Sequence, residues 1–212
     1  RSHTLNINKS HSQDKQSRYI EAFINLDKKG IRVASIYAPN GNPINSEKYK
    51  YKIEWLKKFC NHAEKLLDFE EYTCLGGDFN ICPKSFDAAD ENLLVNDAIY
   101  TTDVKSIYSN IINSGYYDSF RSINPDIPGF TYWDYGQSFK NDIGVRIDHF
   151  LLSPYALDKI DKIVQKVNSF EKEISTLSEN QFKDKTKSLI QKIGNGKSLN
   201  EILPEAYALV RD

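Results

Sequence analysis

The sequence predicts a mixed α+β domain followed by an all-helical segment. Up to about residue 154, strand-like runs rich in β-branched and aromatic residues alternate with runs of helical spacing. Beyond that point the strand pattern ends, and sequence rich in Lys, Glu, Leu and Ile continues with helical spacing alone. With 40% hydrophobic and 12% aromatic residues, the 212-residue chain has the composition of a protein that buries a core, which excludes disorder along its whole length.

The first elements are a hairpin, a helix and a buried strand. Residues 18–26 and 31–38 predict two strands close enough to form the hairpin. Apolar residues spaced by three and four predict a helix over 45–69, and Ser46 is a suitable N-cap. Residues 72–77 predict a short buried strand that ends on two glycines.

Further along, a second helix and two more strands are expected. The helix covers 103–114, with Asp103 as its cap and Gly115 at its end. The strands cover 130–135 and 145–153.

The C-terminal segment predicts three helices, near 155–176, 179–193 and 199–210. The last is interrupted or kinked at Pro204. Ser178 with Gln181 and Ser198 with Glu201 fit capping boxes, and Gly194 fits a helix C-terminus.

Charge and cysteine content exclude several classes of protein. The chain has 28 basic and 29 acidic residues, so its net charge does not indicate a nucleic-acid or membrane partner. A local basic surface is still compatible with this balance. Its three cysteines lack CxxC spacing, which favours free thiols in a reducing cytoplasm over disulfides or zinc. No apolar run reaches the ~20 residues of a membrane span. Because the chain begins with Arg1 and contains no Met, we expect a fragment.

Two short motifs place carboxylates on strands. In GGDFN, residues 76–80, Asp78 and Asn80 follow two glycines and project the same way. The alternative is that Asp78 only forms a turn and that Asn80 only satisfies backbone groups. In GVRIDH, alternation puts Asp148 on the face opposite His149, which we interpret as structural. The ordinary alternative for Asp148 is an ion pair with Arg146, which alternation places on the same side.

Other candidates are aromatic or lie in loops. Tyr37 ends a strand, where its hydroxyl could reach a phosphate, and core packing is the alternative. Tyr132 and Trp133 could stack on a base or sugar, or fill a core. Asp87 and Asp90 follow GGDFN and are interpreted as solvated loop residues.

The order YAPNGNP, LGGDFNICP, GFTYWDY and GVRIDHFLLS resembles the exonuclease III branch of the endonuclease/exonuclease/phosphatase superfamily, which includes AP endonucleases. The likeness covers 18–157. It implies an incomplete four-layer α/β-sandwich followed by a helical tail. It also implies a DNA repair nuclease, a 3′–5′ exodeoxyribonuclease or AP endonuclease, acting with Mg²⁺ or Mn²⁺ on double-stranded DNA with abasic sites or 3′ ends.

The same resemblance implies roles for individual residues. Tyr37 would contact the scissile phosphate, Asp78 would orient or deprotonate the attacking water, and Asn80 would hold phosphate oxygens. Asp148 would orient the family's catalytic His. The expected DNA-binding residues are Asn42, Arg121, Tyr132 and Trp133, of which Trp133 would line the pocket for the sugar or terminal nucleotide.

Parts of the family pattern do not occur in this sequence. The family's opening strands, with an Asn and the metal-binding Glu, have no counterpart before Tyr19, and its Ser-Asp-His triplet has none after Ser153. The metal ligands are therefore unknown, and the fragment is expected to be inactive alone.

Residues 166–212 are similar to the N-terminal start of the preprotein translocase ATPase SecA. The expected organisation is a polar start at 1–17, the nuclease-like domain at 18–157 and a helical segment at 158–212. Two alternatives remain: a non-catalytic gene-fusion remnant, real or a sequence artefact, whose tail meets translocase partners, or a phosphodiesterase of the same fold acting on a non-DNA substrate.

Overall fold

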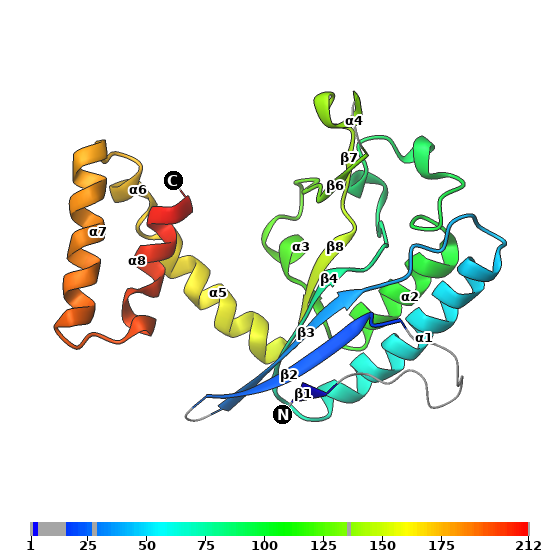
Figure 1. Ribbon diagram of the computed structural model, residues 1–212, viewed down its shortest axis with the longest axis horizontal. Coiled ribbons are helices and arrows are strands. Elements are labelled where there is room, and N and C mark those ends of the chain that lie inside the picture. Colours follow the sequence, from blue (N-terminus) through cyan, green and yellow to red (C-terminus); the bar gives the residue numbers. More distant parts are fainter. Residues whose placement is uncertain (1, 4–15, 27–28, 135–136, 212) are drawn as a thin grey trace. The chain divides into compact units, whose positions relative to one another are not determined.

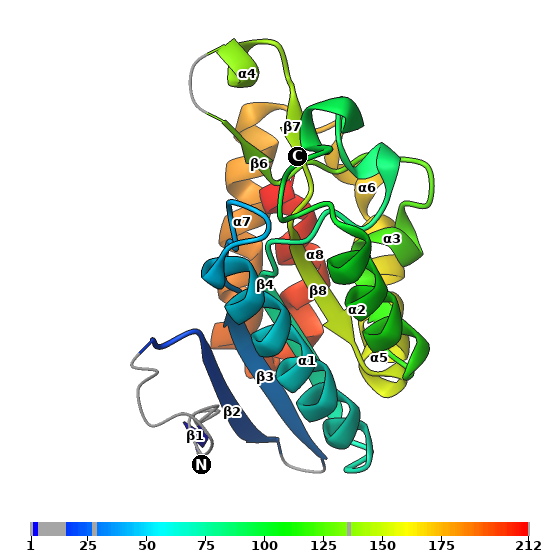
Figure 2. The same ribbon diagram turned by 90° about the vertical axis from the view of Figure 1, so that its right-hand side faces the viewer.

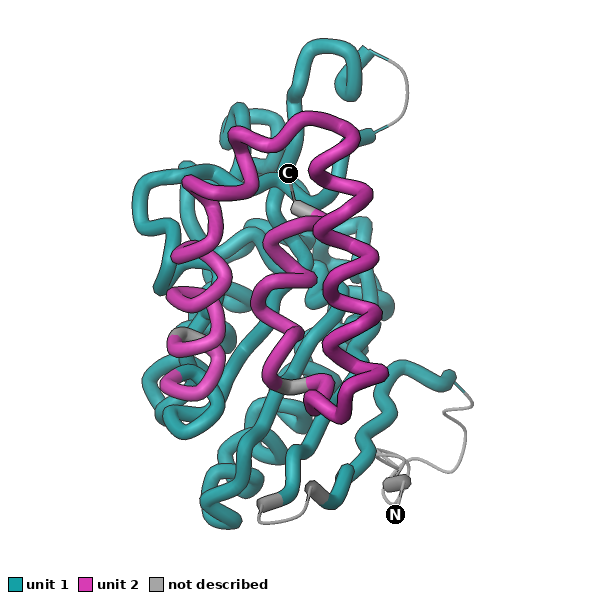
Figure 3. The backbone as a smooth tube through the Cα atoms, turned by 90° about the vertical axis from the view of Figure 1, so that its left-hand side faces the viewer, with its two compact units in different colours: residues 1–157 teal, residues 158–212 magenta. Residues whose placement is uncertain are grey.

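The computed structural model describes residues 2–3, 16–26, 29–134 and 137–211. The chain divides into two compact units, residues 1–157 and 158–212 (Figure 3). The first combines a sheet with helices and the second is helical, so the expected fold class is confirmed.

A six-stranded sheet organises the first unit (Figure 1). Its order is β1-β2-β3-β4-β8-β5, and the strands are β1 (Ser2–His3), β2 (Tyr19–Leu26), β3 (Lys29–Tyr37), β4 (Tyr72–Asp78), β8 (Asp148–Leu152) and β5 (Tyr117–Asp118). The strands β2 and β3 form the predicted antiparallel hairpin. The parallel pairing of β3 with β4 joins it to the antiparallel pair β4 and β8. The expected polar start contributes β1, while residues 4–15 lie outside the described residues.

Two helices cover one face of this sheet, α1 (Glu47–Leu67) and α2 (Thr102–Asn113) (Figure 2). The cap of α1 is Ser46, as predicted, and its side chain accepts a hydrogen bond from the Tyr49 amide. The prediction that Asp103 caps α2 was wrong, because Thr101 caps the helix. Asp103 lies in the first turn, where its negative charge interacts favourably with the helix dipole. Between helices and sheet lies a core that includes Trp55, Phe59, Leu75, Phe79, Ile111 and Tyr116.

The opposite face of the sheet carries exposed apolar side chains. Strand alternation puts Ile20, Ile24, Val33 and Phe150 on this face, with 53%, 49%, 38% and 61% of their surface exposed. Exposed apolar side chains gathered on one sheet face favour association.

The long loops of the first unit carry short elements: η2 (Ser85–Asp87), η3 (Glu91–Leu94), α3 (Ser119–Ile123), β6 (Tyr132–Trp133), α4 (Gln137–Lys140) and β7 (Gly144–Val145). The predicted strand at 130–135 is reduced to β6, which pairs with β7. The predicted strand at 145–153 is broken between β7 and β8. The break arises because the Arg146 amide donates to the Asp87 carbonyl and the Ile147 amide to the Thr131 hydroxyl.

The second unit contains α5 (Pro154–Asn168), which starts in the first unit, α6 (Glu171–Ile174), α7 (Glu179–Gly194) and α8 (Leu199–Arg211). The single helix expected over 155–176 is two helices. The capping box at Ser178 is present, and at Ser198 the Glu201 carboxylate accepts from the Ser198 amide and hydroxyl. Pro204 lies inside α8 without ending it. A small core of Ile174, Leu189, Ile202, Ala208 and Leu209 holds the unit together. In the described part of the chain, no helix combines the length and apolarity needed to cross a membrane.

Candidate active site

Three polar residues form a row across the sheet where β3 and β4 end and β8 begins. Tyr37 is the register partner of Asp78 in the parallel pair, and Asp78 is the register partner of Asp148 in the antiparallel pair. Tyr37 keeps 57% of its surface exposed, so its hydroxyl is accessible. The sheet thus brings together three of the predicted site residues from distant parts of the sequence.

The GGDFN turn fixes the Asp78 carboxylate. Gly77 has a φ of 137°, and a Cβ there would lie 2.1 Å from the Ile36 carbonyl oxygen, so only glycine fits. Asn80 adopts a φ of 50°, which folds its backbone amide onto Asp78 Oδ1 at 2.8 Å. Its side-chain Nδ2 donates to Asp78 Oδ2 at 3.1 Å and to the Ala38 carbonyl at 2.9 Å. Both oxygens of the carboxylate are therefore held by one residue.

Burial dominates the electrostatics of this carboxylate. Desolvation raises the pKa of Asp78, and repulsion from Asp148 adds to the increase, whereas the Asn80 amide, Lys52 and Arg18 oppose it. A cation beside the two carboxylates would relieve their repulsion.

A cavity of about 550 Å³ opens beside this row. Its polar wall contains Tyr37, Asn40, Asn42, Asp78, Asn80 and Asp97. The rest of the lining mixes apolar residues, among them Leu94, Tyr132, Val145 and Ile147, with the polar Asp90, Asp134 and Ser138. No Lys, Arg or His occurs among the described lining residues, so the lining combines acidic, neutral polar and apolar side chains without a cation.

Of the predicted DNA-binding residues, Trp133 lies elsewhere than expected, whereas Tyr132 and Asn42 line the cavity. Trp133 is not among the described lining residues of the cavity; its ring packs against Phe130 and Phe139, and its Nε1 donates to Asp142 at 2.9 Å. Tyr132 lines the cavity instead, because adjacent strand residues point to opposite faces. Asn42 lines the cavity, but its side chain bonds Asp97 and the Ala98 amide.

Arg121 and Asp87 belong to a buried ion-pair cluster. Asp87 is fully buried, so its interpretation as a solvated loop residue was wrong. Its Oδ1 accepts from Arg121 Nη2 at 2.5 Å and from Arg146 Nε at 2.8 Å, and Arg146 also pairs with Asp118 at 2.9 Å. The alternative ion pair between Arg146 and Asp148 was wrong as well, because the break between β7 and β8 interrupts the alternation.

Arg121 also closes a loop. Its Nη1 donates to the carbonyl oxygens of Asn124 and Ile127, each at 2.7 Å. The structure therefore does not bring Arg121 to the row of site residues.

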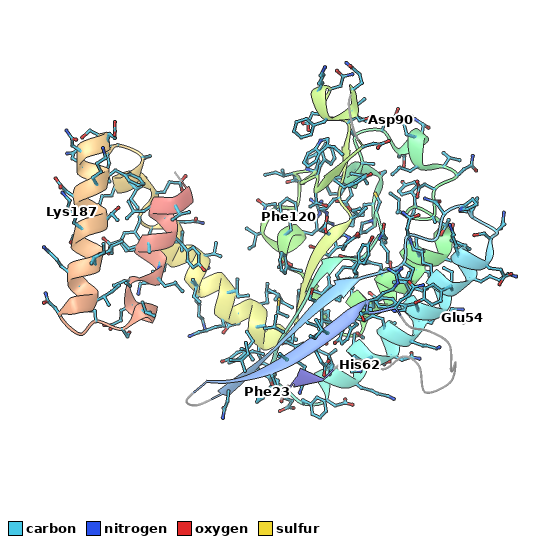
Figure 4. The ribbon with its side chains drawn as sticks, viewed as in Figure 1. Phe23, Glu54, His62, Asp90, Phe120 and Lys187 are labelled. Atoms are coloured by element: carbon cyan, nitrogen blue, oxygen red, sulfur yellow. The ribbon has the colours of Figure 1, made fainter. Side chains whose placement is uncertain are left out.

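The remaining candidate residues lie in three different places: at the cavity, in the core and at the far end of the first unit. Asp90 lines the cavity and caps η3 by accepting from the Asn92 amide. His149 is buried in the core, where its Nε2 contacts the Ile81 carbonyl oxygen at 2.8 Å, which gives it a structural setting. His62 lies on α1 at the opposite end of the first unit from Asp90 (Figure 4).

Arg18 and Lys52 were not among the residues that the sequence motifs indicate as candidates. Arg18 lies over the Tyr37 ring, 5.2 Å from its centroid, and the hairpin pairing implied this neighbour. Lys52 is fully buried beneath the polar wall. The burial of Lys52 could have been predicted from its spacing, because it lies three residues after Tyr49 and four before Leu56, on the apolar face of the predicted helix.

The donor set at this site fits a magnesium ion only in part. No group of three or more His, Cys, Asp or Glu side chains suited to a metal occurs in the described ranges. Magnesium often takes only one or two protein carboxylates and completes its shell with water and phosphate. Asp78 and Asp148 therefore fit an ion shared with a bound phosphate, and not a site closed by protein alone.

Two parts of the chain resemble two different kinds of known protein, nucleases and the translocase subunit SecA. An exodeoxyribonuclease of Bacillus subtilis (strain 168) is 26% identical over 140 residues, 65% of this chain and 55% of that protein. An AP endonuclease structure from Archaeoglobus fulgidus has a TM-score of 0.64 at 31% identity, covering 71% of this chain and 57% of that chain. The chain thus spans about half the length of these nuclease relatives.

The C-terminal segment resembles a different protein. Residues 150–212 match the family model of the SecA DEAD-like domain, which begins earlier than the expected residue 166. The protein translocase subunit SecA of Pelagibacter ubique (strain HTCC1062) is 52% identical over 56 residues, 26% of this chain and 7% of that protein. Both expected resemblances are confirmed.

Proposed function

We propose that the first unit carries the phosphodiester-binding site of a magnesium-dependent DNA repair nuclease of the exodeoxyribonuclease and AP endonuclease type. The observation that carries the proposal is the row Tyr37, Asp78 and Asp148 beside an acidic and apolar cavity. The nuclease relatives and structural neighbours support it.

Each residue of the site has a distinct part in this proposal. The exposed Tyr37 hydroxyl donates a hydrogen bond to a phosphate oxygen. Asp78 orients the attacking water by accepting a hydrogen bond from it. Both side-chain amide protons of Asn80 are used within the protein, so Asn80 orients Asp78.

Phosphate contacts come from a second groove beside the cavity. This groove, of about 280 Å³, shares Asn40 and Asn42 with the cavity and is lined by Arg18 and Lys48. The cavity itself, whose described lining has no cation, suits a neutral sugar better than a further phosphate.

Magnesium, when bound, would neutralise charge that develops on the phosphate. Asp78 and Asp148 are the carboxylates that would hold it, together with the phosphate.

The test compares duplex DNA with and without one abasic site, for binding and for cleavage with and without Mg²⁺. We expect tighter binding to the abasic duplex and no cleavage by this chain, because His149, which follows Asp148, is buried in the core, and His62 lies at the opposite end of the first unit from Asp90. Asp78→Asn should keep or improve the binding, since it removes a negative charge beside the phosphate. Equal binding of both duplexes would contradict the proposal. Mg²⁺-dependent cleavage that is lost in Asp78→Asn would support the function and contradict the expected inactivity.

The second unit supports a separate candidate role. Its match to a SecA DEAD-like domain favours contact with translocase partners, the alternative considered for the tail. The sequence contains no GxxxxGK[ST] nucleotide-binding loop, so this role would be binding and not ATP hydrolysis.

A further inference from the structure

A lysine is buried under the polar wall of the cavity. Lys52, on α1, has no exposed surface. Its Nζ donates three hydrogen bonds to main-chain carbonyl oxygens: Asn80 at 2.7 Å, Ala98 at 2.9 Å and Asn40 at 3.0 Å. An ammonium has three donors, so all of them are used on these carbonyls.

The three carbonyls belong to three separate segments that form the polar wall. Asn40 lies in the loop after β3, Asn80 in the turn after β4, and Ala98 in the loop before α2. Each segment supplies side chains to the cavity: Asn40 and Asn42, Asp78 and Asn80, and Asp97 and Ile99. One ammonium therefore links every segment of that wall.

The lysine side chain also fits its surroundings closely. Gly41 has a φ of 86°, and a Cβ at this glycine would lie 2.5 Å from Lys52 Cδ. The carboxylates of Asp78 and Asp97 favour the charged form of Lys52, whereas burial opposes it and lowers its pKa to about 7. The three carbonyl oxygens offset part of the cost of burying this charge, because each accepts a hydrogen bond from the ammonium.

We propose that Lys52 is the positioning residue of this cavity, which fixes the three wall segments relative to one another through its ammonium. It lies behind the wall and so does not touch a bound ligand. A methionine at this position would leave three carbonyls without their donor and free the segments to move apart.

The first test measures amide chemical shifts by NMR in the full chain. The peptide planes that contain the three carbonyls also contain the amides of Gly41, Ile81 and Ile99. In Lys52→Met we expect these amides to change more than any others outside α1. The matched control is Lys57→Met, which removes an exposed lysine from the same helix and should leave all three unchanged.

A second variant covers the case in which Lys52→Met does not fold. Lys52→Arg keeps the charge, but its donors lie in a rigid plane and cannot converge on three carbonyls as an ammonium does. It should therefore perturb the same three amides. Changes confined to α1 in both variants would overturn the proposal.

The second test uses DNA and rests on the proposed function. Lys52→Met should weaken binding to the abasic duplex by about 10-fold or more, with an unchanged dependence on salt concentration. A salt slope reduced by about 1 would instead mean that Lys52 contacts a phosphate, which overturns the positioning role. If the unsubstituted chain does not prefer the abasic duplex, the proposed function fails, and the NMR test still decides the role of Lys52.

Discussion

Adjacent residues on a short strand can have unrelated roles, as Tyr132 and Trp133 show. Tyr132 lines the cavity, whereas Trp133 packs on Phe130 and Phe139 and bonds Asp142. The sequence motif contains both aromatic residues without distinguishing them. The side of the strand on which each residue lies decides which of the two faces the cavity.

Exchanging each of the two for alanine should separate their roles. Tyr132→Ala should weaken binding to the abasic duplex by about 1 to 3 kcal/mol, the range for loss of one aromatic stacking partner. Trp133→Ala should mainly lower thermal stability, because it removes packing and a hydrogen bond in the loops around β6. Fluorescence anisotropy titrations and thermal melts of both variants measure these effects. A larger loss of binding in Trp133→Ala, in a folded protein, would contradict this assignment.

The buried His149 should make the first unit sensitive to acid. Burial, with repulsion from Arg146, lowers the pKa of His149 to about 4. The unfolded chain, with an ordinary pKa near 6.5, binds a proton first, so the free energy of unfolding falls as the pH drops from about 6.5 to about 4. By pH 5 the loss should be about 2 kcal/mol.

Urea denaturation at pH 7 and pH 5 measures this loss. Both tryptophans, Trp55 and Trp133, lie in the first unit, so their fluorescence follows that unit alone. In His149→Gln the difference between the two pH values should shrink by about the same 2 kcal/mol. The same pH dependence in the variant would show that other groups are responsible.

At the scale of elements, an ion-pair cluster holds the loops against the sheet. Asp87, at the end of η2, accepts bonds from Arg146 between β7 and β8 and from Arg121 in α3. Asp118, just before α3, completes the cluster through Arg146. Three segments of the first unit are thus linked by charges, so removal of one partner leaves others buried and unpaired.

Asp87→Ala should therefore destabilise the first unit by about 3 to 5 kcal/mol. The control is Asp90→Ala, in the same loop, where the lost side chain is an exposed cap of η3 and the cost should be about 1 kcal/mol. Denaturant unfolding followed by tryptophan fluorescence compares the two variants. Similar losses in both would mean that the cluster contributes little.

For the whole molecule, the division into two units predicts how the chain breaks and associates. The second unit has a small core of its own, and the first exposes Ile20, Ile24, Val33 and Phe150 on one sheet face. Limited proteolysis should remove residues 158–212 and leave a resistant, aggregation-prone body. Mass spectrometry of the fragments and light scattering of the body measure both outcomes. A monodisperse monomer with one cooperative transition and a protected tail would show that the two units fold as one.

Elements whose signals are local could be predicted from the amino-acid sequence. Periodicity and caps located α1 and α7, because hydrogen bonds within about four residues decide where helices begin and end. Runs of β-branched and aromatic residues located β2, β3 and β4. The residues of the row, Tyr37, Asp78 and Asp148, could also be identified as candidates from the sequence, since each of them lies in or next to a recognisable motif.

The tertiary structure alone decided which side chains meet across the loops. Arg146 pairs with Asp87 and not with Asp148, and Lys52 reaches three loops at once. These partners are far apart in the sequence, and neither strand alternation nor helical periodicity carries information about the path of a loop between them. Burial of a charge depends on all of its partners together, so it is determined only when the chain has folded.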